Sequence, residues 1–331
     1  MTNTTITAID GLRVGHAHID NVCSGCTVLL TPPEGAVAGV DVRGGAPGTY
    51  GTDTLSPVNL VDRVHGMFLS GGSGFGLSVG DGVRRFLLKE GVGFETSYGR
   101  VPIVSGAIIF DLGMNRSGRL PDSDLGYSAC LMASSDPVQM GSVGAGRGAT
   151  VGKLFGLPRA MKGGLGSYCI AAPTGLKVAA LMVVNAFGDI FDPEGGRIIA
   201  GCRESPRVLN LVDARREILK LTRLSGFSES YHNTVIGVVA TNAKLSKPQL
   251  TKIAQMAHDG IARTVVPSHT LYDGDTIFAI SCGHLEGYDT SLIGHLASEA
   301  VARSIILGVK EATSLNEIPC WKDLAAENVK Q

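Results

Sequence analysis

Residues 224–241 read LSGFSESYHNTVIGVVAT, and the boundary inside this stretch decides the fold. The first ten residues are mostly polar and show no hydrophobic periodicity, whereas an apolar run rich in β-branched residues begins abruptly at Thr234. Such a run is typical of a buried strand. A polar segment that leads into a buried strand is what a processed junction requires. An ordinary helix-to-strand loop has the same appearance and is the commoner explanation of the pattern alone.

The chemistry of a break between Asn233 and Thr234 can be argued from these two residues. A threonine hydroxyl is a poor nucleophile at neutral pH and needs a base. The break would free the α-amine of Thr234, whose unperturbed pKa of about 7.7–8.0 leaves part of it neutral and able to act as that base. Before the break, the same hydroxyl can attack the Asn233 carbonyl and form an ester that water hydrolyses. Nucleophile and base would then belong to one residue.

Further apolar runs bounded by glycine or proline predict buried strands. The clearest runs are residues 26–30, 101–112, 178–187, 235–241 and 276–281. They are nearly continuous rather than alternating, which is typical of strands covered on both faces. Helical spacing predicts helices at residues 58–69, 77–88, 207–224, 247–265 and 292–309. Strands covered on both sides by helices imply a layered α/β fold.

The composition excludes several classes of protein. The 331 residues carry a net charge of −1, with 44% hydrophobic and 18% charged residues, and no basic cluster suggests a nucleic-acid partner. The first residues lack the features of a signal peptide. No run of about 20 apolar residues stands out, so we expect no contact with a membrane. Seven cysteines, among them a lone CxxC whose thiols we expect to be buried, favour a reduced, cytoplasmic protein.

Three glycine clusters suggest a nucleotide site at first sight, namely residues 41–51, 70–76 and 141–153. The third ends in Gly-Lys like a phosphate-binding loop, but Arg147 stands where that loop needs glycine and Leu154 where it needs serine or threonine. Structural turns are the simpler interpretation of all three clusters. A non-catalytic nucleotide-binding protein is therefore kept only as an alternative function.

From the Asn233–Thr234 junction onward, HNTVIGVVATNAKLS resembles the start of the small subunit in the DmpA-type aminopeptidases and the NylC-type nylon-oligomer hydrolases. Similar blocks occur in the family's order along nearly the whole chain, at residues 14–16 (VGH), 40–48 (VDVRGGAPG), 56–65 (SPVNLVDRVH), 70–77 (SGGSGFGL), 101–112 (VPIVSGAIIFDL), 148–153, 183–185 and 272–276 (YDGDT). The resemblance implies a four-layer αββα sandwich of the N-terminal-nucleophile type. It also implies a single domain that cuts itself into residues 1–233 and 234–331.

The resemblance assigns site residues position by position. Thr234 matches the nucleophile, and Asn185 matches an asparagine whose amide can donate to the tetrahedral oxyanion, a contribution of typically about 2.7–4 kcal/mol. Lys153 would stabilise negative charge or lower the pKa of the amine. Asp273 and Asp275 would hold the Thr234 ammonium or hydroxyl, or orient Lys153, and this pair favours the NylC-type branch. Apart from the resemblance, a tight turn is the plainer explanation of YDGDT.

One departure concerns the substrate pocket, where Phe110 stands at a position that is often tyrosine in the family. Any contribution of that hydroxyl is lost. We expect hydrolysis of short peptides, β-peptides or 6-aminohexanoate oligomers through an acyl-enzyme on Thr234, by homotetramers of cleaved heterodimers. No metal or organic cofactor is required. Acyl transfer of the ornithine acetyltransferase type is the enzymatic alternative, although the junction there usually follows glycine or a small residue after lysine.

Overall fold

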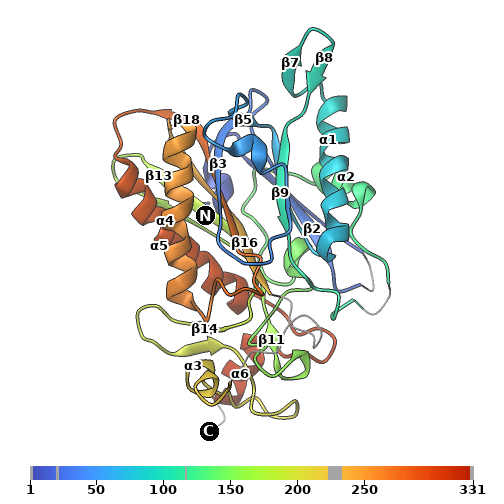
Figure 1. The fold of residues 1–331 in the computed structure, drawn as a ribbon, viewed down its shortest axis with the longest axis vertical. Helices are drawn as coiled ribbons and strands as arrows, with labels where there is room; N and C mark the ends of the chain where they lie inside the picture. Colours follow the sequence, from blue (N-terminus) through green and yellow to red (C-terminus); the bar gives the residue numbers. More distant parts are fainter. Residues whose placement is uncertain (1–2, 20–21, 116–117, 223–232, 329–331) are drawn as a thin grey trace.

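Two large β-sheets pack face to face in the computed structural model, which describes residues 3–19, 22–115, 118–222 and 233–328 (Figure 1). Sheet A contains, in spatial order, β1 (Arg13–His18), β2 (Gly25–Leu30), β6 (Gly66–Ser70), β9 (Val104–Ile108) and β4 (Thr49–Tyr50). Sheet B contains β12 (Gly164–Ala171), β13 (Lys177–Asn185), β16 (Thr234–Ala243), β18 (Thr276–Leu285), β3 (Ala36–Val42) and β5 (Arg63–Val64). The polar stretch at residues 223–232 lies outside the described residues.

Helices cover the outer face of each sheet (Figure 1). The helices α1 (Val79–Lys89) and α2 (Ser123–Leu131) pack on sheet A, and α4 (Lys247–Thr264) and α5 (Thr290–Lys310) pack on sheet B. Alternate residues of β13 from Val178 to Val184 belong to the core between sheet B and its helices, where β13 packs on α5. The residues between them, Ala179, Leu181 and Val183, belong to the core between the two sheets. Burial on both faces explains the continuous apolar runs, and the predicted four-layer αββα fold is confirmed.

The register of sheet B brings the end of β13 and the starts of β16 and β18 together at one end of the strands. β13 and β16 are antiparallel, with Asn185, the last residue of β13, opposite Thr234, the first residue of β16. β16 and β18 are parallel, with Ile236 opposite Thr276. The loop that leads into β18 therefore also reaches this end of the sheet. The end of one strand, the start of the next and an incoming loop meet beside Thr234.

Smaller elements surround the two sheets. They are β7 (Phe94–Thr96), β8 (Gly99–Val101), β10 (Thr150–Val151), β11 (Met161–Lys162), β14 (Asp189–Phe191), β15 (Ile198–Ala200), β17 (Val265–Val266), α3 (Ala214–Ile218) and α6 (Trp321–Asn328). The 3₁₀ helices are Ile6–Ala8, Asp53–Leu55, Ser73–Ser78, Gly144–Gly146 and Leu157–Arg159. The β14 sheet, α3 and α6 lie together at the end of the molecule that carries the C-terminus (Figure 1).

Most predicted elements are present, and two are wrong. The helices predicted at 77–88, 247–265 and 292–309 correspond to α1, α4 and α5. Residues 58–69 were expected to be helical but contain β5 of sheet B and most of β6 of sheet A. Val58 and Leu60 are exposed, and the apolar residues of β6 alternate between the two faces of sheet A, so no single helical stripe is buried. Of the predicted helix 207–224, the described part (residues 207–222) contains only α3. Val208 and Leu219 are exposed, and most helical stability comes from packing.

The helix α5 alters the expectation about membranes. Its 21 residues are long and apolar enough to span a bilayer by length and composition, with a mean hydropathy of 1.4, although no such run was expected from the sequence. In the structure, 61% of the 18-residue window of α5 with this hydropathy is buried, and the helix packs against sheet B and α4 as in the core helix of a globular protein.

The cysteines Cys23 and Cys26 are buried free thiols, as expected.

Candidate active site

Thr234 lies where the three strand ends meet, and its hydroxyl contacts the carbonyl group that precedes it. The side chain is 4% exposed, and its Oγ1 donates a short hydrogen bond to the carbonyl oxygen of Asn233. The backbone N–H of Gly274 donates to the same oxygen at 3.0 Å. Asn233 also forms an isolated parallel bridge with Asp273. The carbonyl at the predicted scissile bond therefore carries two hydrogen bonds, one of them from the predicted nucleophile.

Lys153 and Asn185 form a buried polar pair next to Thr234. The Nζ of Lys153 donates to the backbone oxygen of Asn185 at 3.0 Å and to its Oδ1 at 2.9 Å. Oδ1 of Asn185 also accepts from the Thr150 backbone N–H at 3.0 Å, and its Nδ2 donates to the Phe110 carbonyl at 3.0 Å. In this structure the amide of Asn185 thus organises its neighbours, and its role as an oxyanion donor stays a prediction.

The backbone around Lys153 is tied to the chain just beyond β13. The N–H of Lys153 donates to the Phe187 carbonyl at 2.9 Å, and the N–H of Gly152 donates to the Gly188 carbonyl at 3.0 Å. The third glycine cluster therefore ends in the short strand β10 and a left-handed Gly152, both tied to the core of the protein, rather than in a phosphate-binding loop. This arrangement places the side chain of Lys153 at the end of β13.

Both aspartates of YDGDT lie in the loop that enters β18. Oδ1 of Asp275 accepts from the Val235 backbone N–H at 2.7 Å. Its Oδ2 accepts from His269 twice, from the backbone N–H at 3.1 Å and from the ring Nδ1 at 2.8 Å. Oδ2 of Asp273 accepts from the Thr270 backbone N–H at 2.7 Å. Asp275 thus holds the residue that follows Thr234, and Asp273 pairs with the residue that precedes it.

The first glycine cluster packs directly on this loop. The backbone N–H groups of Arg43 and Gly44 donate to the Asp275 carbonyl at 3.0 and 3.2 Å, and that of Ala46 donates to the Asp273 carbonyl at 2.8 Å. A Cβ at Gly44 would lie 2.2 Å from the Asp273 carbonyl oxygen. Only glycine permits so close an approach. The cluster was expected to be a structural turn, and the turn it forms fixes the two aspartates.

Burial brings the titration of Lys153 and Asp273 close to neutral pH. Burial lowers the pKa of Lys153 to about 7, although Asp273 and Asp111 oppose the shift. Burial, and then the neighbouring Asp275, raise the pKa of Asp273 to about 6. Groups with pKa values near the working pH can carry protons in either direction, and such shifts cluster at functional sites.

A pocket of about 390 Å³ opens onto Thr234, and its volume falls in the range of small-molecule sites. Its wall includes Phe110, Leu77 and Ile108, together with Ser73 and Gly74 of the second glycine cluster and Tyr272 of YDGDT. Among the described residues, no lysine, arginine, aspartate, glutamate or histidine contributes to this lining. The pocket can therefore accept an uncharged, largely apolar group next to Thr234.

The structure brings together the five side chains singled out from the sequence, and Phe110 lies in the pocket wall. Three contributors were missed. The Gly274 N–H and His269 contact the site through a loop conformation that no sequence pattern announces. Asp111 had a signal, since it is an acidic residue directly after an apolar run; it is 3% exposed, and its Oδ1 accepts from the Gly72 N–H at 2.7 Å.

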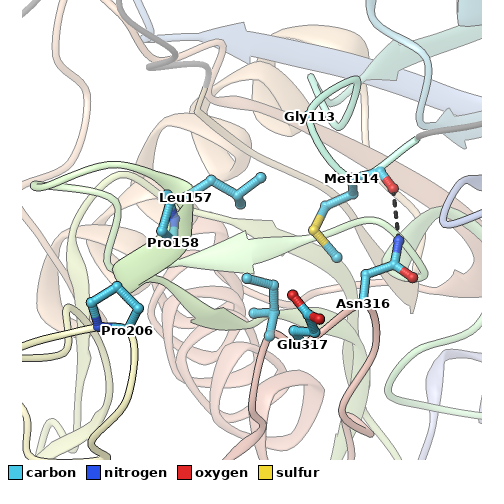
Figure 2. Close-up of a pocket in the computed structure, with 8 residues that line it drawn as sticks. Gly113, Met114, Leu157, Pro158, Pro206, Asn316 and Glu317 are labelled. Carbon is cyan, nitrogen blue, oxygen red and sulfur yellow. Dashed lines mark hydrogen bonds between the residues drawn. The ribbon is translucent and has the colours of Figure 1, made fainter.

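A second pocket, of about 220 Å³, is drawn in Figure 2. Its wall includes Met114, Leu157 and the turn Asn316–Glu317, and none of the predicted site residues lines it. The left-handed φ values of Asn316 (48°) and Glu317 (66°), with mutual hydrogen bonds between Leu315 and Ile318, define a tight hairpin turn. The turn explains the left-handed backbone of Asn316 and Glu317. Because the pocket also lacks the predicted site residues, it is not a candidate active site.

The four layers are those of the N-terminal-nucleophile hydrolase fold. Two solved structures share this fold with the chain. The L-aminopeptidase D-Ala-esterase/amidase from Ochrobactrum anthropi aligns with a TM-score of 0.71 and 16% identity over 100% of this chain and 95% of that one. A Burkholderia sp. beta-aminopeptidase aligns with a TM-score of 0.71 and 20% identity over 99% and 94%.

The chain belongs to peptidase family S58, whose model matches residues 4–318. It is similar to an uncharacterized aminopeptidase of Mycobacterium bovis, with 39% identity over 345 residues that cover 97% of each chain. It is also similar to the 6-aminohexanoate-oligomer endohydrolase of a Kocuria species, with 30% identity over 318 residues, 91% of this chain and 84% of the relative. The protein is accordingly a hydrolase that acts on amide bonds.

Proposed function

We propose that this protein is a self-processing amide hydrolase whose nucleophile is Thr234. The observation that carries the proposal is the contact of the Thr234 hydroxyl with the Asn233 carbonyl oxygen, which also accepts the Gly274 N–H at 3.0 Å. The hydroxyl is close to the carbonyl it would attack. The amide N–H lies where the negative charge of a tetrahedral intermediate would develop.

The proposed processing step is an acyl shift followed by hydrolysis. Oγ1 of Thr234 bonds to the Asn233 carbonyl carbon, and the Gly274 N–H stabilises the oxyanion. The hydroxyl proton passes to the amide nitrogen of Thr234 as the C–N bond breaks, which leaves an ester between the two residues. Water then hydrolyses the ester to a carboxylate on Asn233 and restores the hydroxyl, now beside a free α-amine.

The mature enzyme would use the same hydroxyl on substrates. The neutral α-amine of Thr234 takes the hydroxyl proton as Oγ1 attacks the substrate amide, and it returns a proton to the departing amine. Water then hydrolyses the acyl-enzyme. Lys153, bonded to Asn185, supplies positive charge that lowers the pKa of the amine. Asp275 and Asp273 hold the chain on either side of Thr234.

The substrates we propose are short peptides, β-peptides or 6-aminohexanoate oligomers with an apolar group on the acyl side. The uncharged lining of the 390 Å³ pocket, with Phe110 in its wall, supports an apolar acyl group. The names of the Kocuria and Burkholderia relatives support oligoamides and β-peptides as classes. We also propose that the cleaved chains assemble as cytoplasmic homotetramers, as the family resemblance implies.

The test is an intact mass of the purified protein under denaturing conditions. We expect fragments 1–233 and 234–331, with the smaller one beginning at Thr234, and we expect Thr234→Ala to stay whole. Release of amine from an amide without a second amine acceptor then separates hydrolysis from acyl transfer. A wild-type chain that remains whole after prolonged incubation would refute self-processing.

A further inference from the structure

His269 was not among the site residues predicted from the sequence, and it makes two hydrogen bonds to one of those residues. Its backbone N–H and its ring Nδ1 both contact Oδ2 of Asp275, at 3.1 and 2.8 Å. The other carboxylate oxygen of Asp275 accepts the Val235 N–H at 2.7 Å. The Asp275 carboxylate is therefore a bridge, with His269 on one side and the residue after Thr234 on the other.

We propose that His269 is a positioning residue of this active site. It fixes the Asp275 carboxylate, which fixes the start of β16 and with it the hydroxyl of Thr234. The inference rests on the proposed function, since it assigns His269 to the same chemistry. Because a carboxylate oxygen can only accept, the Nδ1 of His269 must be the protonated ring nitrogen that donates this hydrogen bond.

The backbone of His269 supports this role. Its φ is 57°, in the left-handed region that residues other than glycine seldom occupy. Such a conformation is unfavourable for a residue with a side chain and persists where the surroundings enforce it. Here the left-handed turn lets the backbone N–H and the ring N–H of one residue point at the same oxygen. The two bonds to Asp275 offset the cost of the turn.

The far side of the His269 ring is also held. His258 of α4 lies edge-on to it, with ring centroids 4.9 Å apart and an interplanar angle of 71°. His258 is fully buried and its Nε2 contacts the Asp41 carbonyl at 3.1 Å; Asp41 itself pairs with Arg43 at 2.8 Å. Burial lowers the pKa of His258 to about 4, so this neighbour is uncharged at neutral pH. The ring of His269 is wedged between a neutral imidazole and the Asp275 carboxylate.

The position of His269 predicts which kinetic constant it affects. His269 is absent from the described lining of the substrate pocket, so its loss removes no side chain that a bound substrate would contact. Loss of the Nδ1 donor frees the Asp275 carboxylate to turn and lets the start of β16 shift. A displacement of the nucleophile by about 1 Å can cost on the order of a hundredfold in rate. The effect should therefore fall on kcat and on self-cleavage rather than on KM.

The experiment compares His269→Ala with His269→Asn in the full chain. Asparagine tolerates the left-handed conformation and presents an amide N–H near the position of Nδ1. We expect His269→Ala to slow self-cleavage and lower kcat by about tenfold or more, with KM within about twofold. We expect His269→Asn to retain both rates within about threefold. His284→Asn, the same change at an exposed position of β18, is the control and should match the wild type.

Two further variants keep the proposal testable if His269→Ala folds poorly. His269→Gln fills the space but places its amide one bond farther along, so it should behave as the alanine variant. In a double-mutant cycle, His269→Ala should add little to the loss caused by Asp275→Asn, because both act through one contact. A kcat for His269→Ala within twofold of wild type, an asparagine variant as slow as the alanine variant, or additive losses would overturn the role of His269. Failure of the wild type to cleave would instead overturn the proposed function.

Discussion

Replacing Gly274 by alanine tests whether the position of the Thr234 hydroxyl controls the chemistry. A Cβ at Gly274 would lie 2.9 Å from Thr234 Oγ1 and 3.0 Å from the Ala46 carbonyl oxygen, whereas ordinary contacts begin at 3.4 Å. Gly274 is not in the left-handed region, so the backbone accepts alanine. The hydroxyl must therefore retreat by about 0.5 Å, the difference between 3.4 and 2.9 Å. If 1 Å costs on the order of a hundredfold, this retreat costs about tenfold, or about 1.4 kcal/mol in the barrier.

The effect on stability should be small by comparison. Alanine lowers the entropy of the unfolded chain and stabilises by about 0.4–1 kcal/mol, which offsets part of the typical overpacking cost of about 1–3 kcal/mol. Self-cleavage of freshly translated chain, followed by mass under denaturing conditions, should slow about tenfold while Tm changes by a few degrees at most. Gly195→Ala is the control, since its nearest neighbour would be 3.4 Å away. If Gly274→Ala cleaves at the wild-type rate, the hydroxyl contact seen here is not the reactive one.

For two other substitutions the structure predicts the direction of the change in stability or in the pH profile. Asn185→Ala removes the acceptor of the Thr150 N–H and one of the acceptors of Lys153 Nζ, and a buried N–H without an acceptor costs about 1–3 kcal/mol, so Tm and turnover should both fall. An unchanged Tm would show that this amide does not hold the segment around Thr150. Asp273→Asn removes a charge that raises the pKa of Lys153, so the alkaline limb of kcat/KM should move to lower pH, and an unmoved limb would show that the two groups are not coupled. The raised pKa of Asp273 means that its protonated form stabilises the fold below pH 3.8 and that this stability is lost as pH rises through about 6. Urea unfolding of Asp273→Asn should therefore lack that part of the pH dependence.

The layers of the fold could be predicted because burial on both faces leaves a plain signature. β13 and β16 are continuous apolar runs, and α4 and α5 carry wide apolar stripes that pack on them. Residues 58–69 were misassigned because a short apolar run has no period of its own. Whether Phe68 and Leu69 follow a helical stripe or alternate across a sheet depends on what lies on each side. That information belongs to the tertiary structure.

The site was partly predictable for a different reason. Thr234 could be argued from its own chemistry, and the resemblance supplied Asn185 and Lys153. Neither source could find His269, because its contact with Asp275 depends on a single left-handed residue in a loop. The glycine clusters were expected to be turns, which is a local property. Their close approach to Asp273 and to the pocket is a relation between distant segments, and no local pattern encodes it.

The placement of β16 has a consequence for processing. In sheet B, β16 and β18 are neighbours and lie between β13 and β3. A break before Thr234 would assign the two inner strands to one fragment and the strands on either side to the other. β16 pairs with β13 over eight residue pairs, and the side chains of both strands are buried in the core. Separating the fragments would expose that core to water, so cleavage cannot release them. The break would change only the ends of the chain at the site, where it would convert an amide nitrogen into a base beside the hydroxyl that needs one.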